Sequence, residues 1–159
     1  MSGFITYIQF LWDSKNQHGI HSPFVYKLYT EGLKNKQLKN SNRTLQGLQR
    51  IVSYFKFSQI NCSDSLKHLC LTITEMKADP SAEGQLLCCS IKEFEILDKA
   101  VLEAKNPIFV TDLYESKESI TIWNQFCNNV KIDVSIDCYY YGLLFFRPSQ
   151  RKEHFKLRT

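Results

Sequence analysis

The amino-acid sequence predicts a single α/β domain with a mostly parallel sheet, and three observations support this fold class. Residues 1–56 carry three helical patterns, and the stretch after them alternates short apolar runs with further helical patterns. Two closely spaced apolar runs near the C-terminus are typical of an antiparallel hairpin. The 159 residues suffice for one hydrophobic core but hardly for two. We therefore expect an N-terminal helical extension over 1–56 and a sheet-containing core over 57–159.

Each N-terminal helix has its own signal. The apolar residues between 4 and 12 recur at helical spacing and predict a short amphipathic helix. Ser22 followed by Pro23 is typical of an N-cap and a first helical position, because proline needs no N–H there. The third helix should be capped by Asn42 and bury a stripe that consists of Leu45, Leu48, Ile51, Val52 and Phe55.

The core should alternate strands and helices. The apolar run 108–110 suits a strand that is covered on both faces. Helices are expected after each of the first three strands, and they begin at Asp64, at Ile91 and after Ser116, with a loop over 77–84. The strands expected over 131–138 and 142–147 should be joined by a turn at Tyr139–Gly142. Strands are thus predicted over 58–63, 85–90, 107–112, 131–138, 142–147 and 153–158.

The composition argues against several classes of protein. The formal charge of +4 is too modest for the dense basic stripe of most nucleic-acid-binding proteins. No segment approaches the roughly 20 apolar residues that span a bilayer, and the apolar N-terminus lacks the basic residues and cleavage site of a signal peptide. Six cysteines without a CxxC pair lie in apolar segments, where reduced cysteine packs as a small hydrophobe. We therefore expect a cytoplasmic protein with free thiols that contacts neither nucleic acid nor membrane.

Three stretches of the chain resemble one family. They are HGIHSPFVYKLYTEG over 18–32, RIVSYFKFSQI over 50–60, and the last third from Ile108 to Arg158. Each is similar to the matching segment of bacterial class I methyltransferases that use S-adenosylmethionine. The resemblance implies a Rossmann-like fold with an antiparallel C-terminal hairpin. It also implies that the second and third strands are missing, which leaves the order 1-4-5-7-6 in the strand numbering of the family and makes the first strand an edge.

The same resemblance shows which functional motifs are lacking. The family holds its cofactor with a glycine-rich turn after the first strand, an acidic residue that binds the ribose, and an Asp-Gly pair ending the fourth strand. Here the first strand leads into INCSDSLKHLC, which has no glycine, and the corresponding later strand ends in Cys88-Cys89-Ser90. We therefore expect a degenerate, methyltransferase-like pseudoenzyme that binds no cofactor and serves as a binding or scaffold module. Its partner would be a second copy or a full-length relative.

Two other functions remain open from the sequence. The chain could be an active methyltransferase on a small molecule that holds S-adenosylmethionine in an unfamiliar way. It could also be a folded relic without a selected role.

Few residues stand out as candidates for a site. Asp112 aligns with the second acid of an Asp-Asp pair in the family, but Thr111 replaces the first, so it is a weak catalytic candidate. His18, His21 and Tyr26 lie in the segment expected at the ligand side of the family fold. The two histidines are three residues apart, as metal ligands often are, but the glycine and proline nearby predict a loop, and we expect no metal.

Three further features have ordinary structural explanations. Cys88 and Cys89 should point to opposite faces of a strand rather than pair. The basic residues of 147–158 could contact phosphate but are also typical of a protected strand edge. The tyrosines at 139–141 could mark an interface.

Overall fold

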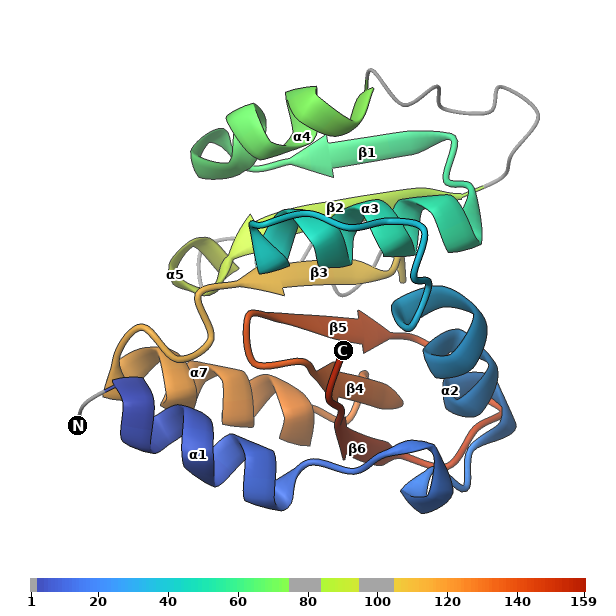
Figure 1. The fold of residues 1–159 in the computed structure, drawn as a ribbon, viewed down its shortest axis with the longest axis vertical. Coiled ribbons are helices and arrows are strands. Elements are labelled where there is room, and N and C mark those ends of the chain that lie inside the picture. The colour runs from blue at the N-terminus through green and yellow to red at the C-terminus, as the bar shows by residue number, and fades with distance from the viewer. Residues whose placement is uncertain (1–2, 75–83, 95–104) are drawn as a thin grey trace.

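A computed structural model describes residues 3–74, 84–94 and 105–159 as one sheet with helices on both faces (Figure 1). The N-terminal elements are α1 (Gly3–Asp13), η1 (Gln17–Gly19), α2 (Pro23–Lys27), the π-helical η2 (Leu28–Leu33) and α3 (Arg43–Phe55). The core contains β1 (Gln59–Cys62), η3 (Asp64–Leu66), α4 (Lys67–Thr74), β2 (Gln85–Ser90), α5 (Ile91–Phe94), β3 (Ile108–Thr111), α7 (Lys117–Asn128), β4 (Val134–Asp137), β5 (Tyr141–Phe145) and β6 (Glu153–Lys156).

The sheet has six strands in the order β1-β2-β3-β5-β4-β6. Strands β1, β2 and β3 pair in parallel, β5 runs antiparallel between β3 and β4, and β6 pairs in parallel with β4. The predicted α/β class, the mostly parallel sheet and the antiparallel C-terminal hairpin are therefore confirmed. As expected, β1 lies at an edge, where Gln59 and Asn61 are exposed.

The strand order differs from the order implied by the resemblance, which contained five strands and left the predicted strand over 153–158 without a place. The sixth, β6, is added next to β4 and forms the second edge. The reason lies in the loop before it, which returns the chain to the start of β4. There the Arg147 N–H donates to the Asp133 carboxylate at 2.6 Å, and the Glu153 N–H donates to the Asp133 carbonyl oxygen at 2.8 Å.

Two buried clusters lie on the two faces of the sheet. One joins residues of α2, η2, α3 and α4 to the sheet and includes Val25, Leu48 and Cys88. The other joins α5 and α7 to the sheet and includes Cys89 and Trp123. Because neighbouring side chains of a strand point to opposite faces, the vicinal cysteines pack in different clusters, as predicted.

Local signals placed the helix starts correctly. Ser22, Asn42 and Ser116 are the N-caps of α2, α3 and α7, and each accepts a hydrogen bond from the backbone N–H three residues further on. The predicted stripe of α3 is also confirmed: Leu48 and Ile51 are fully buried, and the other three positions are partly buried. The later parts of the helices predicted from Asp64 and from Ile91, and most of the predicted loop 77–84, lie outside the described residues.

Two glycines permit close packing across the layers. A Cβ on Gly47, in the middle of α3, would overlap the ring of Tyr141 on β5, and a Cβ on Gly142 would overlap the ring of Trp123 on α7. These contacts bring one helix close to each face of β5. The predicted turn at Tyr139–Gly142 is too long, because Tyr141 and Gly142 already belong to β5. The turn closes earlier, where the Cys138 N–H donates to the Tyr141 carbonyl oxygen at 2.9 Å.

Candidate functional site at the carboxyl edge of the sheet

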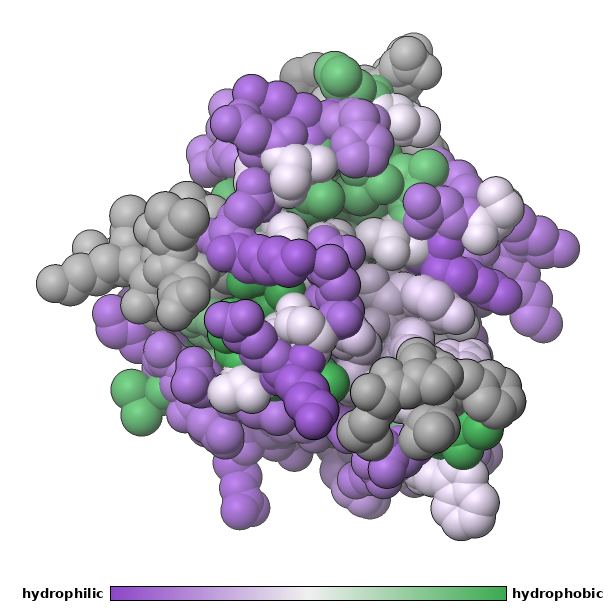
Figure 2. All heavy atoms as spheres, turned by 90° about the vertical axis from the view of Figure 1, so that its left-hand side faces the viewer, coloured by the Kyte–Doolittle hydropathy of each residue, from purple (hydrophilic) through white to green (hydrophobic). Residues whose placement is uncertain are grey.

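The parallel strands all end at one edge of the sheet, which is where open α/β folds bind their ligands. Polar residues end or follow the strands there: Ser63 after β1, Ser90 at the end of β2, Asp112 after β3 and Asp137 at the end of β4. Figure 2 looks at the side that lies on the left in Figure 1, where the arrows of β1 and β3 end. It shows hydrophilic side chains with small hydrophobic areas between them. Two different hydrogen-bonded groups lie along this line of strand ends, one beside β1 and β2 and the other beside β4.

Asp112 lies at this edge, as the sequence predicted. It has left-handed backbone, with φ of 64°, so that the chain turns sharply out of β3. Its side chain is exposed and accepts a hydrogen bond from the Thr111 hydroxyl at 2.8 Å. Thr111 thus acts as a donor to the carboxylate that follows it.

At the β1–β2 end, one carboxylate joins the two strand ends. Glu93 of α5 accepts hydrogen bonds from the Ser63 hydroxyl at 2.5 Å, the Ser65 hydroxyl at 2.7 Å and the Ser90 N–H at 3.2 Å. Slight burial raises the pKa of Glu93, but the three donors lower it by more, so the net shift is downward. A charged side chain therefore lies between the segments that follow β1 and end β2.

A disulfide further fixes the end of β1. Cys62, the last residue of β1, is bonded to Cys70 of α4, and their Cα atoms are 6.6 Å apart. The prediction that all six thiols are free is therefore wrong for this pair, because α4 folds back over β1 and brings the two sulfurs together. Cys88, Cys89, Cys127 and Cys138 are free and buried, as predicted for cysteines that pack as small hydrophobes.

At the β4 end, a tyrosine donates to a buried carboxylate. The Tyr114 hydroxyl, in the turn after β3, donates to Asp137, whose second oxygen accepts the Tyr139 N–H at 2.8 Å. Only 1% of Asp137 is exposed, and burial raises its pKa despite the two donors and nearby Lys156. Burial and the neighbouring Asp137 also raise the pKa of Tyr114. Sequence reasoning missed this pair, because 23 residues separate the two groups.

Helix α1 covers this pair with aromatic rings. The Phe10 ring is 6.2 Å from that of Tyr114 and 5.4 Å from that of Tyr139, and the Tyr7 ring is 4.8 Å from that of Tyr139. The rings of Tyr114 and Tyr139 stack at 4.8 Å. The tyrosine turn that the sequence singled out as a possible interface thus contacts the N-terminal helix of the same chain.

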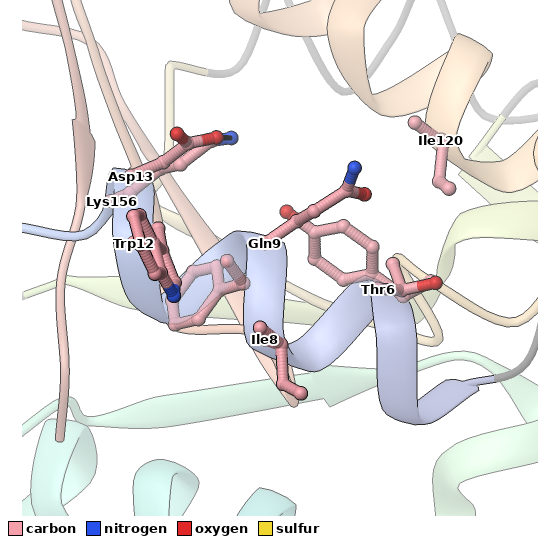
Figure 3. A pocket seen from close by; sticks show the side chains of 9 residues that line it. Thr6, Ile8, Gln9, Trp12, Asp13, Ile120 and Lys156 are labelled. Atoms are coloured by element: carbon pink, nitrogen blue, oxygen red, sulfur yellow. Dashed lines mark hydrogen bonds and ion pairs between the residues drawn. The ribbon is translucent and has the colours of Figure 1, made fainter.

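A hollow of about 560 Å³ lies beside α1 and reaches α7. In Figure 3, Ile120 of α7 faces Thr6 and Gln9 of α1 across it, and the ion pair between Asp13 and Lys156, at 3.1 Å, closes one end. The rings of Phe10 and Tyr114 also line it.

One side of α1 is exposed although it is apolar. Ile8 is 39% and Trp12 85% exposed, and they are one helical turn apart, so they lie on the same side of the helix. The sequence predicted the helix but not that its tryptophan would remain uncovered.

The other predicted site residues are not gathered at the end of β3. The Phe24 ring packs 5.1 Å from that of Phe145, whose neighbour Leu144 pairs with Ile108, the first residue of β3. The start of α2, and His21 just before it, therefore lie near the start of β3, whereas Asp112 lies beyond its end. Tyr26 is exposed.

His18 belongs to a different hollow. It is exposed in η1 and lines a space of about 400 Å³ together with Tyr29, Thr30, Lys34, Lys36 and Asn16. His21 is exposed and is not one of the residues that line this space.

The basic C-terminal segment is largely engaged within the chain. Arg158 donates to the Ser14 hydroxyl at 2.7 Å and to the Leu11 carbonyl oxygen at 2.6 Å, and Lys152 donates to the carbonyl oxygens of Asn129 and Ile132. The Arg147 guanidinium lies 4.1 Å from the centre of the Phe24 ring. These contacts favour the structural explanation of the tail over a phosphate-binding patch.

Comparison of the chain with protein-family models, curated proteins and solved structures finds no match. Among residues 3–74, 84–94 and 105–159, every helix is too short or too polar to cross a membrane.

Proposed function

We propose that this protein is a reduced relative of bacterial class I methyltransferases that no longer uses S-adenosylmethionine and acts as a binding or scaffold module. The fold is compatible with this ancestry, because a Rossmann-like sheet alternates parallel strands with helices on both faces. The insertion of β5 antiparallel between β3 and β4 supports it further.

The single observation that carries the loss of cofactor use is the position of Glu93. A nucleotide-like ligand needs the backbone after the first strand to approach closely and to offer free donors. Here the donors of Ser63, Ser65 and Ser90 all point to the Glu93 carboxylate. A ligand at this place would have to break three hydrogen bonds to an ionised group, each of which is stronger than a neutral hydrogen bond.

The exposed side of α1 supports the binding part of the proposal. Ile8 and Trp12 offer an apolar contact beside a charged pair, which is the mixture that the centre and rim of protein interfaces have. A tryptophan is also among the residues that contribute most to such interfaces. The proposed partner is a second copy of the chain or a full-length relative.

Calorimetric titration with S-adenosylmethionine tests the loss of cofactor binding. We expect no saturable heat, whereas a dissociation constant in the micromolar range, about −8 kcal/mol of binding free energy, would contradict the proposal. Turnover of labelled cofactor that is abolished in Asp112→Ala, but not in the control Glu31→Ala, would instead establish an active enzyme. Glu31 is a suitable control because it is an exposed acidic residue of η2, outside the segments that follow the strands.

Light scattering at increasing protein concentration tests the binding surface. We expect the wild-type chain to self-associate, or to bind a full-length relative, and Trp12→Ala to remain monomeric. Val130→Ala serves as the control, because Val130 is 91% exposed just after α7. A wild-type chain that stays monomeric and retains no relative in a pull-down would refute this surface.

A further inference from the structure

Three cysteines meet at the β1 edge of the sheet. The sulfur atoms of Cys62, Cys70 and Cys88 all lie within 4.8 Å of one another. Cys62 and Cys88 are direct partners in the parallel pair of β1 and β2, and Cys70 reaches them from α4. The disulfide uses two of these sulfurs, and the third remains a thiol.

We propose that Cys62, Cys70 and Cys88 form a redox-controlled binding site for a thiophilic closed-shell cation, which is Zn²⁺ or Cu(I). Three thiolates around one such ion, at metal–sulfur distances of about 2.3 Å, would lie about 3.8–4.0 Å apart. The Cys88 sulfur already lies within 4.8 Å of both sulfurs of the disulfide, so that side-chain rotations which separate Cys62 and Cys70 suffice once the disulfide is open. Soft thiolate ligands select these two ions over the hard cations that oxygen ligands prefer.

The burial of the three residues fits a site with limited access. Cys88 is fully buried, Cys70 is 6% exposed, and Cys62 is partly buried, so that Cys62 is the most accessible of the three to water. Zn²⁺ with three protein ligands accepts a water molecule as its fourth ligand, whereas Cu(I) needs no fourth ligand.

Oxidation state decides whether the site exists. A phosphine reductant opens the disulfide, because the phosphine takes the oxygen of one water molecule and each sulfur gains a hydrogen atom. The ion then binds three thiols and releases their three protons. Oxidised glutathione reverses the change, because it takes two electrons and two protons from the two thiols and becomes two molecules of glutathione. The disulfide between Cys62 and Cys70 forms again. Metal binding and the disulfide therefore exclude each other.

Metal content of the whole chain tests the proposal. The protein is reduced with a phosphine, incubated with Zn²⁺ or, under nitrogen, with Cu(I), and freed of unbound metal before elemental analysis. We expect one ion per reduced chain and at least about a tenfold lower content in the oxidised chain. With Co²⁺ as a spectroscopic probe, a sulfur-to-metal charge-transfer band should appear only after reduction. Binding of either ion supports the site, and competition between them identifies the preferred one.

Variants separate this site from chance binding. Cys88→Ser should lose the ion and the cobalt band, whereas the control Cys127→Ser, a buried cysteine in the cluster on the other face, should keep both. If circular dichroism shows that Cys88→Ser does not fold, Cys62→Ser, a change at the partly buried position, is used in its place. A reduced wild-type chain without metal, equal binding before and after reduction, or full binding in a folded Cys88→Ser or Cys62→Ser variant would overturn the proposal.

Discussion

Removal of the Tyr114 hydroxyl should destabilise the protein to a degree that depends on pH. Tyr114→Phe keeps the ring that stacks on Tyr139 but removes the donor to Asp137. Asp137 is then left with the Tyr139 N–H, at 2.8 Å, as its remaining donor among the hydrogen bonds described above. A buried carboxylate that loses a partner costs far more than an exposed one, because water cannot replace the lost donor.

The sign of the pH dependence follows from the raised pKa of Asp137, which burial causes. A carboxyl group whose pKa is raised in the folded state stabilises the fold at pH values below its pKa in the unfolded chain, which is about 3.9. This contribution is lost as pH rises through the raised pKa of the folded state. Removing one donor to the carboxylate raises that pKa further. We expect Tyr114→Phe to cost about 1 kcal/mol below pH 4, where a neutral hydrogen bond is lost, and about 2–3 kcal/mol at pH 8, where a charged one is lost.

Urea unfolding at pH 4 and pH 8 measures the difference. At pH 8 the loss corresponds to a drop in melting temperature of roughly 4–12 °C for a domain of this size. Tyr140→Phe is the matched control, because Tyr140 belongs to the same turn but is 42% exposed, and we expect it to be nearly neutral at both pH values. Equal destabilisation of Tyr114→Phe at the two pH values would refute the reasoning about the buried carboxylate.

Three further predictions concern packing, the Glu93 network and the disulfide. Gly47→Ala should lower the free energy of unfolding in urea by about 1–3 kcal/mol, because the Cβ of alanine overlaps the Tyr141 ring. This loss should outweigh the better helix propensity of alanine, and a stabilised variant would contradict the reasoning. Glu93→Gln should lower the free energy of unfolding by up to about 1 kcal/mol at pH 7, because the side chain is partly solvated. This loss should become smaller as pH falls, because a carboxyl group with a lowered pKa stabilises the fold only at pH values above its ordinary pKa. A loss that grows in acid would be inconsistent with the three donors. Reduction of Cys62–Cys70, whose residues are 8 apart, should cost about 2.5 kcal/mol in metal-free buffer by the chain-entropy relation, and unchanged urea unfolding would show that the disulfide does not stabilise the fold.

The two carboxylates show why only part of the site could be predicted. Asp112 was singled out from the sequence because it aligns with an acid of the family motif, and its position directly after an apolar strand run places it at the carboxyl edge. Asp137 also ends a strand, but nothing local reveals that its partner is Tyr114, because that contact depends on how β3, β4 and α1 meet. The Glu93 network was missed for the same reason: Ser63 and Ser65 follow β1, whereas Ser90 ends β2 and Glu93 lies on α5, and only the sheet brings these segments together.

The sequence by itself determined the helix caps, the alternation of strands and helices, and the two-sided burial of the central strands. These features depend on neighbouring residues and on side-chain periodicity, which act at short range. Only the tertiary structure decided that Cys62 meets Cys70, that β6 joins the sheet beside β4, and that Trp12 stays exposed. Contacts between distant segments depend on which faces pack and at what angle, and no local pattern encodes that choice.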